Sequence, residues 1–567
     1  MRRRLVGCLL MAGLALTGGC RPTAPKPSAW EGFRDGFLEA YFRARPSFAV
    51  YQGRHEFDGQ FPDWSDAGLR RWIAELHRWR DSAIGIDSAG LSSPERFERE
   101  YLVAQIDKDL FWNETAEWPW KNPAYYGSAL DPNVYVARPY TPPATRLRAL
   151  TRWLAGVPEA LGQIRANLRT PLPRPYVEIG RIRFGGLIGF LSRDAPAVFA
   201  GVSDTALQHS YRAATDSAVA ALKAMDDWLA AQLPHATGDF AMGPELFAKM
   251  LRETEQVDVP LAALDSLGRA DLRRNREALR AACEEFAPHA PVAECVRRAD
   301  LKKPAGGPIA GARAQLVLLK EFLTDAKLVS IPGQEKPEVE ESPPYQRWNF
   351  AYIDIPGPYE HGLPSVYYIA PPDPNWSAAE QAEYIPGESQ LLFTSVHEVW
   401  PGHFLQFLHS NRAASPFGQV FVGYAFAEGW AHYSEEMMWD AGLGKGDPLF
   451  HIGQLREALL RDARFLSAIG LHTGGMTLAQ AEALFRNEAY TDAATARQQA
   501  ARGTFDPAYL NYTMGKLMIR RLREDWTRSR GGRAAWQSFH DAFLSYGGPP
   551  IPLVRRAMLG PDNGSPF

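Results

Sequence analysis

The stretch WEGFRDGFLEAYFRAR at residues 30–45 decides the fold class. Its apolar residues recur at spacings of three and four, which places them on one face of an α-helix. The same spacing recurs in LRRWIAELHRWRDSA (69–83) and in ALTRWLAGVPEALGQIRANL (149–168). We therefore predict a mainly α fold, in which amphipathic helices pack around a buried core.

The composition of the 567-residue chain is that of a large globular protein, with 46% hydrophobic and 22% charged residues. Its formal net charge is -3 and it has no long basic run. This balance argues against a nucleic-acid partner, because nucleic-acid binding needs a concentrated positive surface.

The first 20 residues have the pattern of an export signal. Three arginines at 2–4 precede an apolar run at 5–16, and small residues at 17–19 precede Cys20. The apolar run is shorter than the roughly 20 residues that a membrane-spanning helix needs. We predict a signal peptide over 1–20 with lipidation at Cys20, and hence a periplasmic or outer-membrane lipoprotein of the bacterial cell envelope that touches the membrane only through its lipid. Simple cleavage and secretion is the alternative.

The rest of the chain is predicted to form one helical domain, residues 30–567, behind a Pro-rich linker at 21–29. A charged run at 336–341 is the best candidate for a seam, and we expect it to be a surface loop. It would divide an N-terminal half (about 30–335) from a catalytic C-terminal half (about 345–567).

One segment differs from the helical pattern. RWNFAYIDIPGPYEHGLPSVYYIAPPDP (347–374) has aromatic and β-branched runs broken by Gly and Pro, which predicts a short hairpin or sheet just before the key motif. An edge strand there could hold an extended peptide by backbone hydrogen bonds. An aromatic-packed loop is the alternative.

Cysteine usage limits the choice of metal ligands. Removal of the signal leaves Cys20, Cys283 and Cys295, and the last two are close enough in sequence to form a disulfide in an oxidising compartment. Two buried thiols are the alternative. Because no cysteines have zinc-finger spacing, a metal ion would have to be held by His and carboxylates.

Such residues occur in GESQLLFTSVHEVWPGHFLQFLHSNR (387–412), whose apolar spacing predicts a buried helix carrying His397, Glu398 and His403. In zinc peptidases two imidazoles bind the metal while an adjacent glutamate takes a proton from water.

The spacing of the two histidines is unusual. The common HExxH motif places them four residues apart on one helical face, whereas six residues separate them here, about 240° around an unbroken helix. Pro401 and Gly402 lie between them and can interrupt the helix. We predict that this break turns His403 toward the metal held by His397.

A third ligand is predicted in GYAFAEGWAHYSEEMMWD (423–440), where Glu428 lies in an apolar helix and would need a partner if buried. His432 shares its face one turn later. It could support the ligands from behind or replace Glu428 as the ligand itself.

At these residues the chain resembles the domain-of-unknown-function 885 family (DUF885), bacterial proteins described as metallopeptidases. HEVWPGH and EGWAHYSE match its signature, and the segments at 37–69, 469–485 and 507–523 are similar to its other parts. The resemblance implies a large zincin-like helical fold around a deep cleft. It also implies one zinc ion on His397, His403 and Glu428, with Glu398 as general base.

The C-terminal matches suggest which groups complete the site. Peptide hydrolysis needs a donor for an oxyanion, and His472, Tyr509 and Tyr512 are the candidates, with catalytic roles expected for His472 and Tyr512. Arg464 could bind a substrate carboxylate. For at least two of the three arginines Arg456, Arg461 and Arg464 we expect an exposed charged face.

The predicted function is zinc-dependent hydrolysis of peptide bonds, in short peptides. An amidase or esterase acting on cell-envelope material would use the same site, and a non-catalytic metal-binding lipoprotein is a further alternative. The sequence leaves open the oligomeric state and whether cleavage is internal or terminal.

Overall fold

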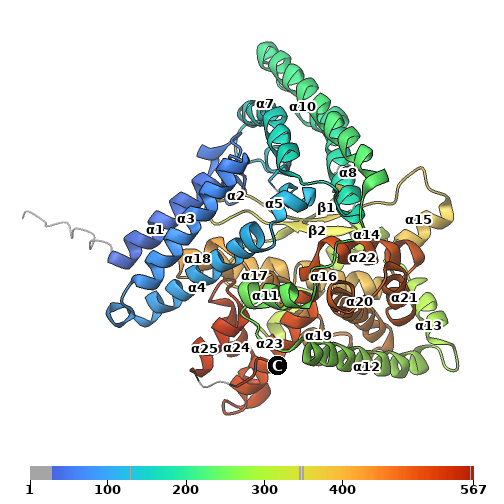
Figure 1. The fold of residues 1–567 in the computed structure, drawn as a ribbon. Coiled ribbons are helices and arrows are strands. Elements are labelled where there is room, and N and C mark those ends of the chain that lie inside the picture. Colours follow the sequence, from blue (N-terminus) through green and yellow to red (C-terminus); the bar gives the residue numbers. More distant parts are fainter. Residues whose placement is uncertain (1–27, 128, 344–345, 348–349, 562–563) are drawn as a thin grey trace, which may run out of the picture.

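The structure is a computed structural model and confirms a mainly α fold (Figure 1). The predicted signal peptide, Cys20 and most of the Pro-rich linker lie outside the described residues. The described residues are 28–127, 129–343, 346–347, 350–561 and 564–567. No helix among them combines the length and apolar character needed to span a bilayer.

The segments with helical periodicity form helices where the sequence predicts them. Residues 30–45 lie largely in α1, which starts at a capping box between Ser28 and Glu31, and the other two segments lie in α3 and α7. The first ten helices are α1 (Ala29–Ala44), α2 (Pro46–Tyr51), α3 (Asp66–Gly85), α4 (Ser93–Leu110), α5 (Trp118–Lys121), α6 (Asn133–Ala137), α7 (Pro143–Asn167), α8 (Arg174–Gly189), α9 (Ala195–Phe199) and α10 (Thr205–Gln232).

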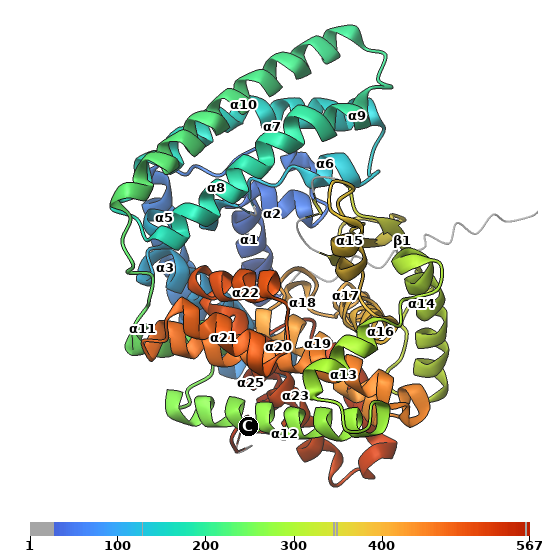
Figure 2. The same cartoon turned by 90° about the vertical axis from the view of Figure 1, so that its right-hand side faces the viewer.

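Most of the remaining helices build the lower part of the molecule in Figures 1 and 2, while α7 and α10 lie at the top in both views. The remaining helices are α11 (Pro244–Glu255), α12 (Leu261–Phe286), α13 (Val292–Asp300), α14 (Gly307–Asp325), α15 (Ala378–Tyr384), α16 (Glu388–Glu398), α17 (His403–Ser410), α18 (Pro416–Val420), α19 (Tyr424–Asp440), α20 (Pro448–Thr473), α21 (Leu478–Glu488), α22 (Ala493–Phe505), α23 (Asn511–Thr527), α24 (Trp536–Leu544) and α25 (Ile551–Leu559).

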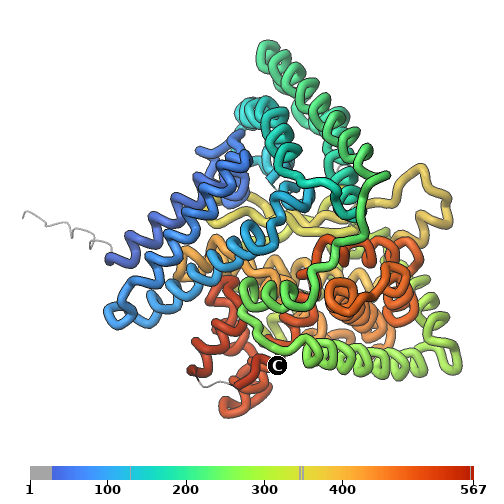
Figure 3. Tube along the Cα trace, in the orientation of Figure 1, coloured from blue at the N-terminus to red at the C-terminus, as the bar shows by residue number. Residues whose placement is uncertain are grey.

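Two clusters of buried apolar side chains form the core. One is built mainly from α1 to α10 and takes in Phe417 of α18 and Phe421 at its end, while the other fills the space among the later helices. The trace leaves α10 and descends to α11 between these two parts (Figure 3). The predicted seam at 336–341 falls after α14, inside the region served by the second cluster.

The predicted sheet is present and lies against α16. Strands β2 (Ala351–Asp354) and β3 (Ser365–Ile369) pair antiparallel, and β1 (Pro337–Glu341) adds a parallel edge, giving the order β1-β3-β2. The hydroxyl of Tyr367 on β3 lies 3.5 Å from that of Ser395 on α16. The sheet therefore supports the helix that carries His397.

The expectation that the charged run at 336–341 is a surface loop is wrong, because most of it forms β1. Only Val339 of this strand is buried, and its three glutamates are exposed at the edge of the sheet. Charged side chains are common on edge strands, where they discourage pairing with other chains. The residue types resembled a loop because the strand has so little buried surface.

The disulfide between Cys283 and Cys295 is confirmed. It joins the end of α12 to α13, and both cysteines are buried. The alternative of two unpaired thiols is excluded.

Helices α19 and α23 approach each other at two glycines. A Cβ atom added to Gly515 would lie 2.1 Å from the carbonyl oxygen of Ala425, and one added to Gly429 would lie 2.5 Å from the Cα of Gly515. Any larger residue would push the backbones apart. This contact places Glu428 and Tyr512, which flank the two glycines, on facing helices.

We expect Gly515→Ala to lower the free energy of unfolding by about 1–3 kcal/mol, because the new methyl group meets rigid backbone. Gly162→Ala is the matched control, since Gly162 is an exposed glycine of α7 with open space around it. Urea unfolding followed by circular dichroism measures both variants. A Gly515→Ala protein as stable as the control would contradict the close contact.

Candidate metal centre

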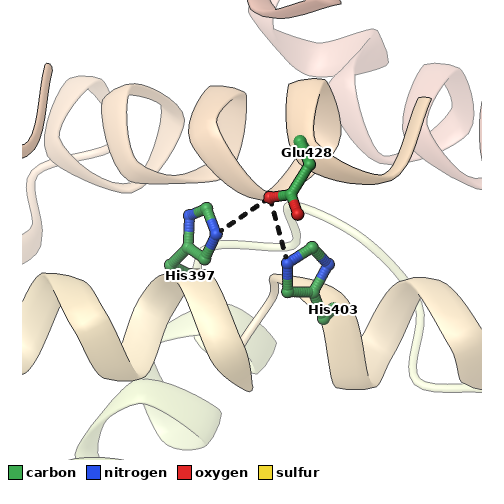
Figure 4. Close-up of side chains that lie close together, drawn as sticks. All are labelled: His397, His403 and Glu428. Atoms are coloured by element: carbon green, nitrogen blue, oxygen red, sulfur yellow. Dashed lines mark ion pairs between the residues drawn. The ribbon is translucent and has the colours of Figure 1, made fainter. Parts of the chain in front are cut away.

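His397, His403 and Glu428 converge on one point from three helices (Figure 4). His397 lies in the last turn of α16, His403 is the first residue of α17, and Glu428 is on α19. Oε2 of Glu428 lies 3.3 Å from Nε2 of His397 and 3.4 Å from Nε2 of His403. One potential ligand atom from each residue lies within 4.8 Å of the other two, so the three residues could hold a metal ion. They are called the metal group below.

The predicted break between the histidines is confirmed, because α16 ends at Glu398 and α17 starts afresh at His403. The N–H of Gly402 donates to the carbonyl of Val396 at 2.9 Å. A Cβ atom on Gly402 would lie 1.7 Å from the carbonyl oxygen of His397, so only glycine fits. The indole N–H of Trp430 donates to the carbonyl of Pro401 at 2.8 Å and holds the connection against α19.

Glu435, the last residue of the EGWAHYSE motif, to which the sequence analysis gave no role, supports His397 from behind. Its Oε1 accepts from Nδ1 of His397 at 2.7 Å, and its Oε2 accepts from Nδ1 of His432 at 3.1 Å. Because Nδ1 donates, Nε2 of His397 carries no proton, and its lone pair is free to bind a metal. Glu435 is seven residues after Glu428, two turns along the same face of α19, and this spacing was the available signal.

The charge of Glu435 is maintained by its neighbours. Burial works against ionisation, but Arg461, whose guanidinium lies 3.2 Å away, and the two imidazoles hold the pKa of Glu435 well below its usual range. Burial and the positive charge of Lys516 lower the pKa of His432 to about 4, so this imidazole is neutral. The structure places His432 behind Glu435 rather than among the three converging residues.

Glu398 follows His397 directly and is half-buried. Among the described residues no group forms a hydrogen bond with its carboxylate. Burial raises the pKa of Glu398, and the imidazoles of His403 and His397 act in the opposite direction. A carboxylate that is both unpartnered and beside a metal group is available for proton transfer.

Tyr512 lies against the metal group. Its ring stacks on that of His397 with 6.3 Å between centroids, and the guanidinium carbon of Arg464 lies 4.8 Å from the centre of the same ring. Burial and the negative charge of Glu428 raise the pKa of Tyr512, so its hydroxyl stays protonated and can donate. Arg464 and His397 therefore both lie near the ring of Tyr512.

The structure does not bring Tyr509 and His472 into this group. The hydroxyl of Tyr509 bonds to Ser467 in the core. Nε2 of His472 donates to the carbonyl of Gly503 at 2.7 Å, and its Nδ1 accepts the N–H of Met242 at 3.3 Å. Since both ring nitrogens are used by the backbone, we assign His472 no step in the chemistry.

The expected exposed face of arginines on α20 is also wrong. Arg461 and Arg464 are buried, and Arg456 is half-buried and pairs with Asp300. The sequence pattern misled because each arginine has polar partners from distant segments, which no local spacing reveals.

The donor set fits zinc. Two imidazole nitrogens and a carboxylate are typical ligands of a catalytic zinc ion, which keeps a further position open. Oε2 of Glu428, the atom nearest both histidines, is buried and lacks a hydrogen-bond partner in the described structure, as expected for a group that binds a cation.

The chain belongs to the DUF885 family, described as bacterial proteins of unknown function, whose model matches residues 46–558. The resemblance drawn from the two motifs is thereby confirmed. Among curated proteins, none matches this chain.

Two solved structures share the fold. A candidate lipoprotein of unknown function from Shewanella oneidensis is 22% identical, with a TM-score of 0.76 over 94% of this chain and 100% of its own. A candidate lipoprotein from Colwellia psychrerythraea is 15% identical, with a TM-score of 0.80 over 94% of this chain and 99% of its own.

We expect Glu435→Gln to weaken metal binding by about 10- to 100-fold, because His397 loses the charged acceptor that orients it. Glu436→Gln is the matched control: its carboxylate, on the next residue of α19, pairs with Arg274 and Arg520 instead. Competition with a chromogenic chelator measures affinity, and thermal unfolding measures stability. Equal metal affinity in the two variants would remove Glu435 from the site.

Proposed function

We propose that the protein is a zinc-dependent hydrolase that cleaves peptide bonds in short peptides. The observation that carries this proposal is the convergence of His397, His403 and Glu428 beside the unpartnered carboxylate of Glu398. A site kept only to bind a metal has no need of a free base next to its ligands.

In this proposal His397, His403 and Glu428 would hold one zinc ion. A bound zinc ion supplies Lewis acidity, which lowers the pKa of water and polarises a carbonyl oxygen. Glu435 keeps the ring of His397 in place and in the correct tautomer through its bond to Nδ1.

Glu398 moves the proton. Its carboxylate takes a proton from the attacking water and then delivers it to the nitrogen of the leaving amine. The hydroxyl of Tyr512, kept protonated by burial, donates to the oxyanion that forms on the scissile carbonyl. The position of its ring against His397 supports this role.

The setting of the reaction is also part of the proposal. Export through the signal at 1–20 and lipidation of Cys20 would place the enzyme in the bacterial cell envelope. Similarity to two candidate lipoproteins supports this placement. A zincin-like cleft above the metal group would admit short peptides and exclude folded proteins.

The direct test is the zinc content of the purified protein together with cleavage of a mixed peptide library read by mass spectrometry. We expect near-stoichiometric zinc, cleavage that a chelator abolishes, and a kcat lower by about 10²–10⁴-fold in Glu398→Gln, which keeps all three ligands. Zinc without cleavage would reject the peptidase, and full activity in Glu398→Gln would reject the base.

We further expect His403→Ala to lose most of its zinc, because two ligands remain. His409→Ala is the matched control, since this histidine of the same helix bonds to the carbonyl of Ser330. Elemental analysis after dialysis gives the metal content. If both variants kept equal zinc, His403 would not be a ligand.

A further inference from the structure

Three arginines surround the ring of Tyr512, and two of them are neutralised by carboxylates. Arg461 pairs with Glu435 and Glu457, and Arg502 pairs with Asp506. The guanidinium carbons of Arg461, Arg464 and Arg502 lie 5.8, 4.8 and 5.9 Å from the ring centre. Arg464 is the one of the three that forms no ion pair within the described structure.

Arg464 is only 8% exposed, yet its bonding is incomplete. Its Nε donates to Oε1 of Gln499 at 2.9 Å, and neither Nη atom has an acceptor among the described residues. Neither Nη atom is fully buried, so both can be reached from solvent. A buried guanidinium without a counter-charge is costly, so the arrangement suits an anion that arrives from outside.

We propose that Arg464 binds the C-terminal carboxylate of the peptide substrate, so that the enzyme removes short fragments from the carboxyl end. This inference rests on the proposed peptidase function and names its substrate class. The planar guanidinium matches a carboxylate with two parallel hydrogen bonds. A ligand with two negative charges, such as a phosphate, fits less well than a carboxylate. It would need a second unpaired cation, and Arg461 and Arg502 are already paired with carboxylates.

The position of Arg464 sets where the chain is cut. Its guanidinium and the ring of His397 both lie near the ring of Tyr512, at 4.8 and 6.3 Å from its centre. One extended residue spans about 3.3–3.6 Å, so a carboxylate held at Arg464 brings a peptide bond within a few residues of the chain end to the metal group. Water adds to that carbonyl, the C–N bond breaks, and the proton passes to the amine of the released fragment.

The test uses two mixed tetrapeptide libraries that differ only in ending with a free carboxylate or a carboxamide. Zinc-loaded Glu398→Gln protein is dialysed against each library, and the retained peptides are counted by mass spectrometry. We expect roughly 10- to 100-fold preference for the free acids, lost when Arg464→Gln is added. Adding Arg456→Gln instead leaves the preference intact, because that arginine of the same helix is bound to Asp300.

Turnover gives a second readout in the protein with Glu398 intact. Arg464→Gln should raise KM for free-acid peptides with a smaller change in kcat. Arg464→Lys keeps the charge, so its KM should lie between that of wild type and that of Arg464→Gln. Thermal unfolding checks that each variant is folded.

The outcomes separate the two proposals. Acid preference that depends on Arg464 without any cleavage by wild type would reject the peptidase and keep the carboxylate site. Equal cleavage of both libraries, a preference unchanged by Arg464→Gln, or retention of neither library would overturn the role of Arg464.

Discussion

The metal group depends on the lack of a side chain at Gly402. Its backbone lies so close to the carbonyl of His397 that a methyl group has no room, and this contact folds the chain back where a continuous helix would have carried His403 away. The indole of Trp430 then fastens the connection to α19. The helix that supplies Glu428 is thus tied to the loop that positions the histidines.

Ion pairs and hydrogen bonds behind the metal group fix the positions of its ligands. Glu435 shares its two oxygens among His397, His432 and Arg461, so one buried carboxylate orients groups from α16, α19 and α20. A charge buried so deeply is tolerated because each oxygen has partners. The same reasoning makes Arg464 stand out, since its charge has no carboxylate partner in the described structure.

Much of the site could be predicted because its signals are local. His397, Glu398 and His403 lie within seven residues of one another. Pro401 and Gly402 between them indicate that the helix is interrupted, and Glu428 lies in an apolar helix. Periodicity likewise predicted the helices. The partners of His472 and Arg456 could not be predicted, because they come from segments far along the chain. The strand β1 was missed since one buried valine leaves almost no alternation to detect.

The break between α16 and α17 also determines how related proteins are recognised. A pattern written for two histidines four residues apart passes over HEVWPGH, although its imidazoles meet at one carboxylate. In this chain the two histidines lie at the end of one helix and at the start of the next. Surveys of genomes for metal-binding histidine pairs would therefore gain from describing interrupted helices as well as the continuous helix of the four-residue spacing.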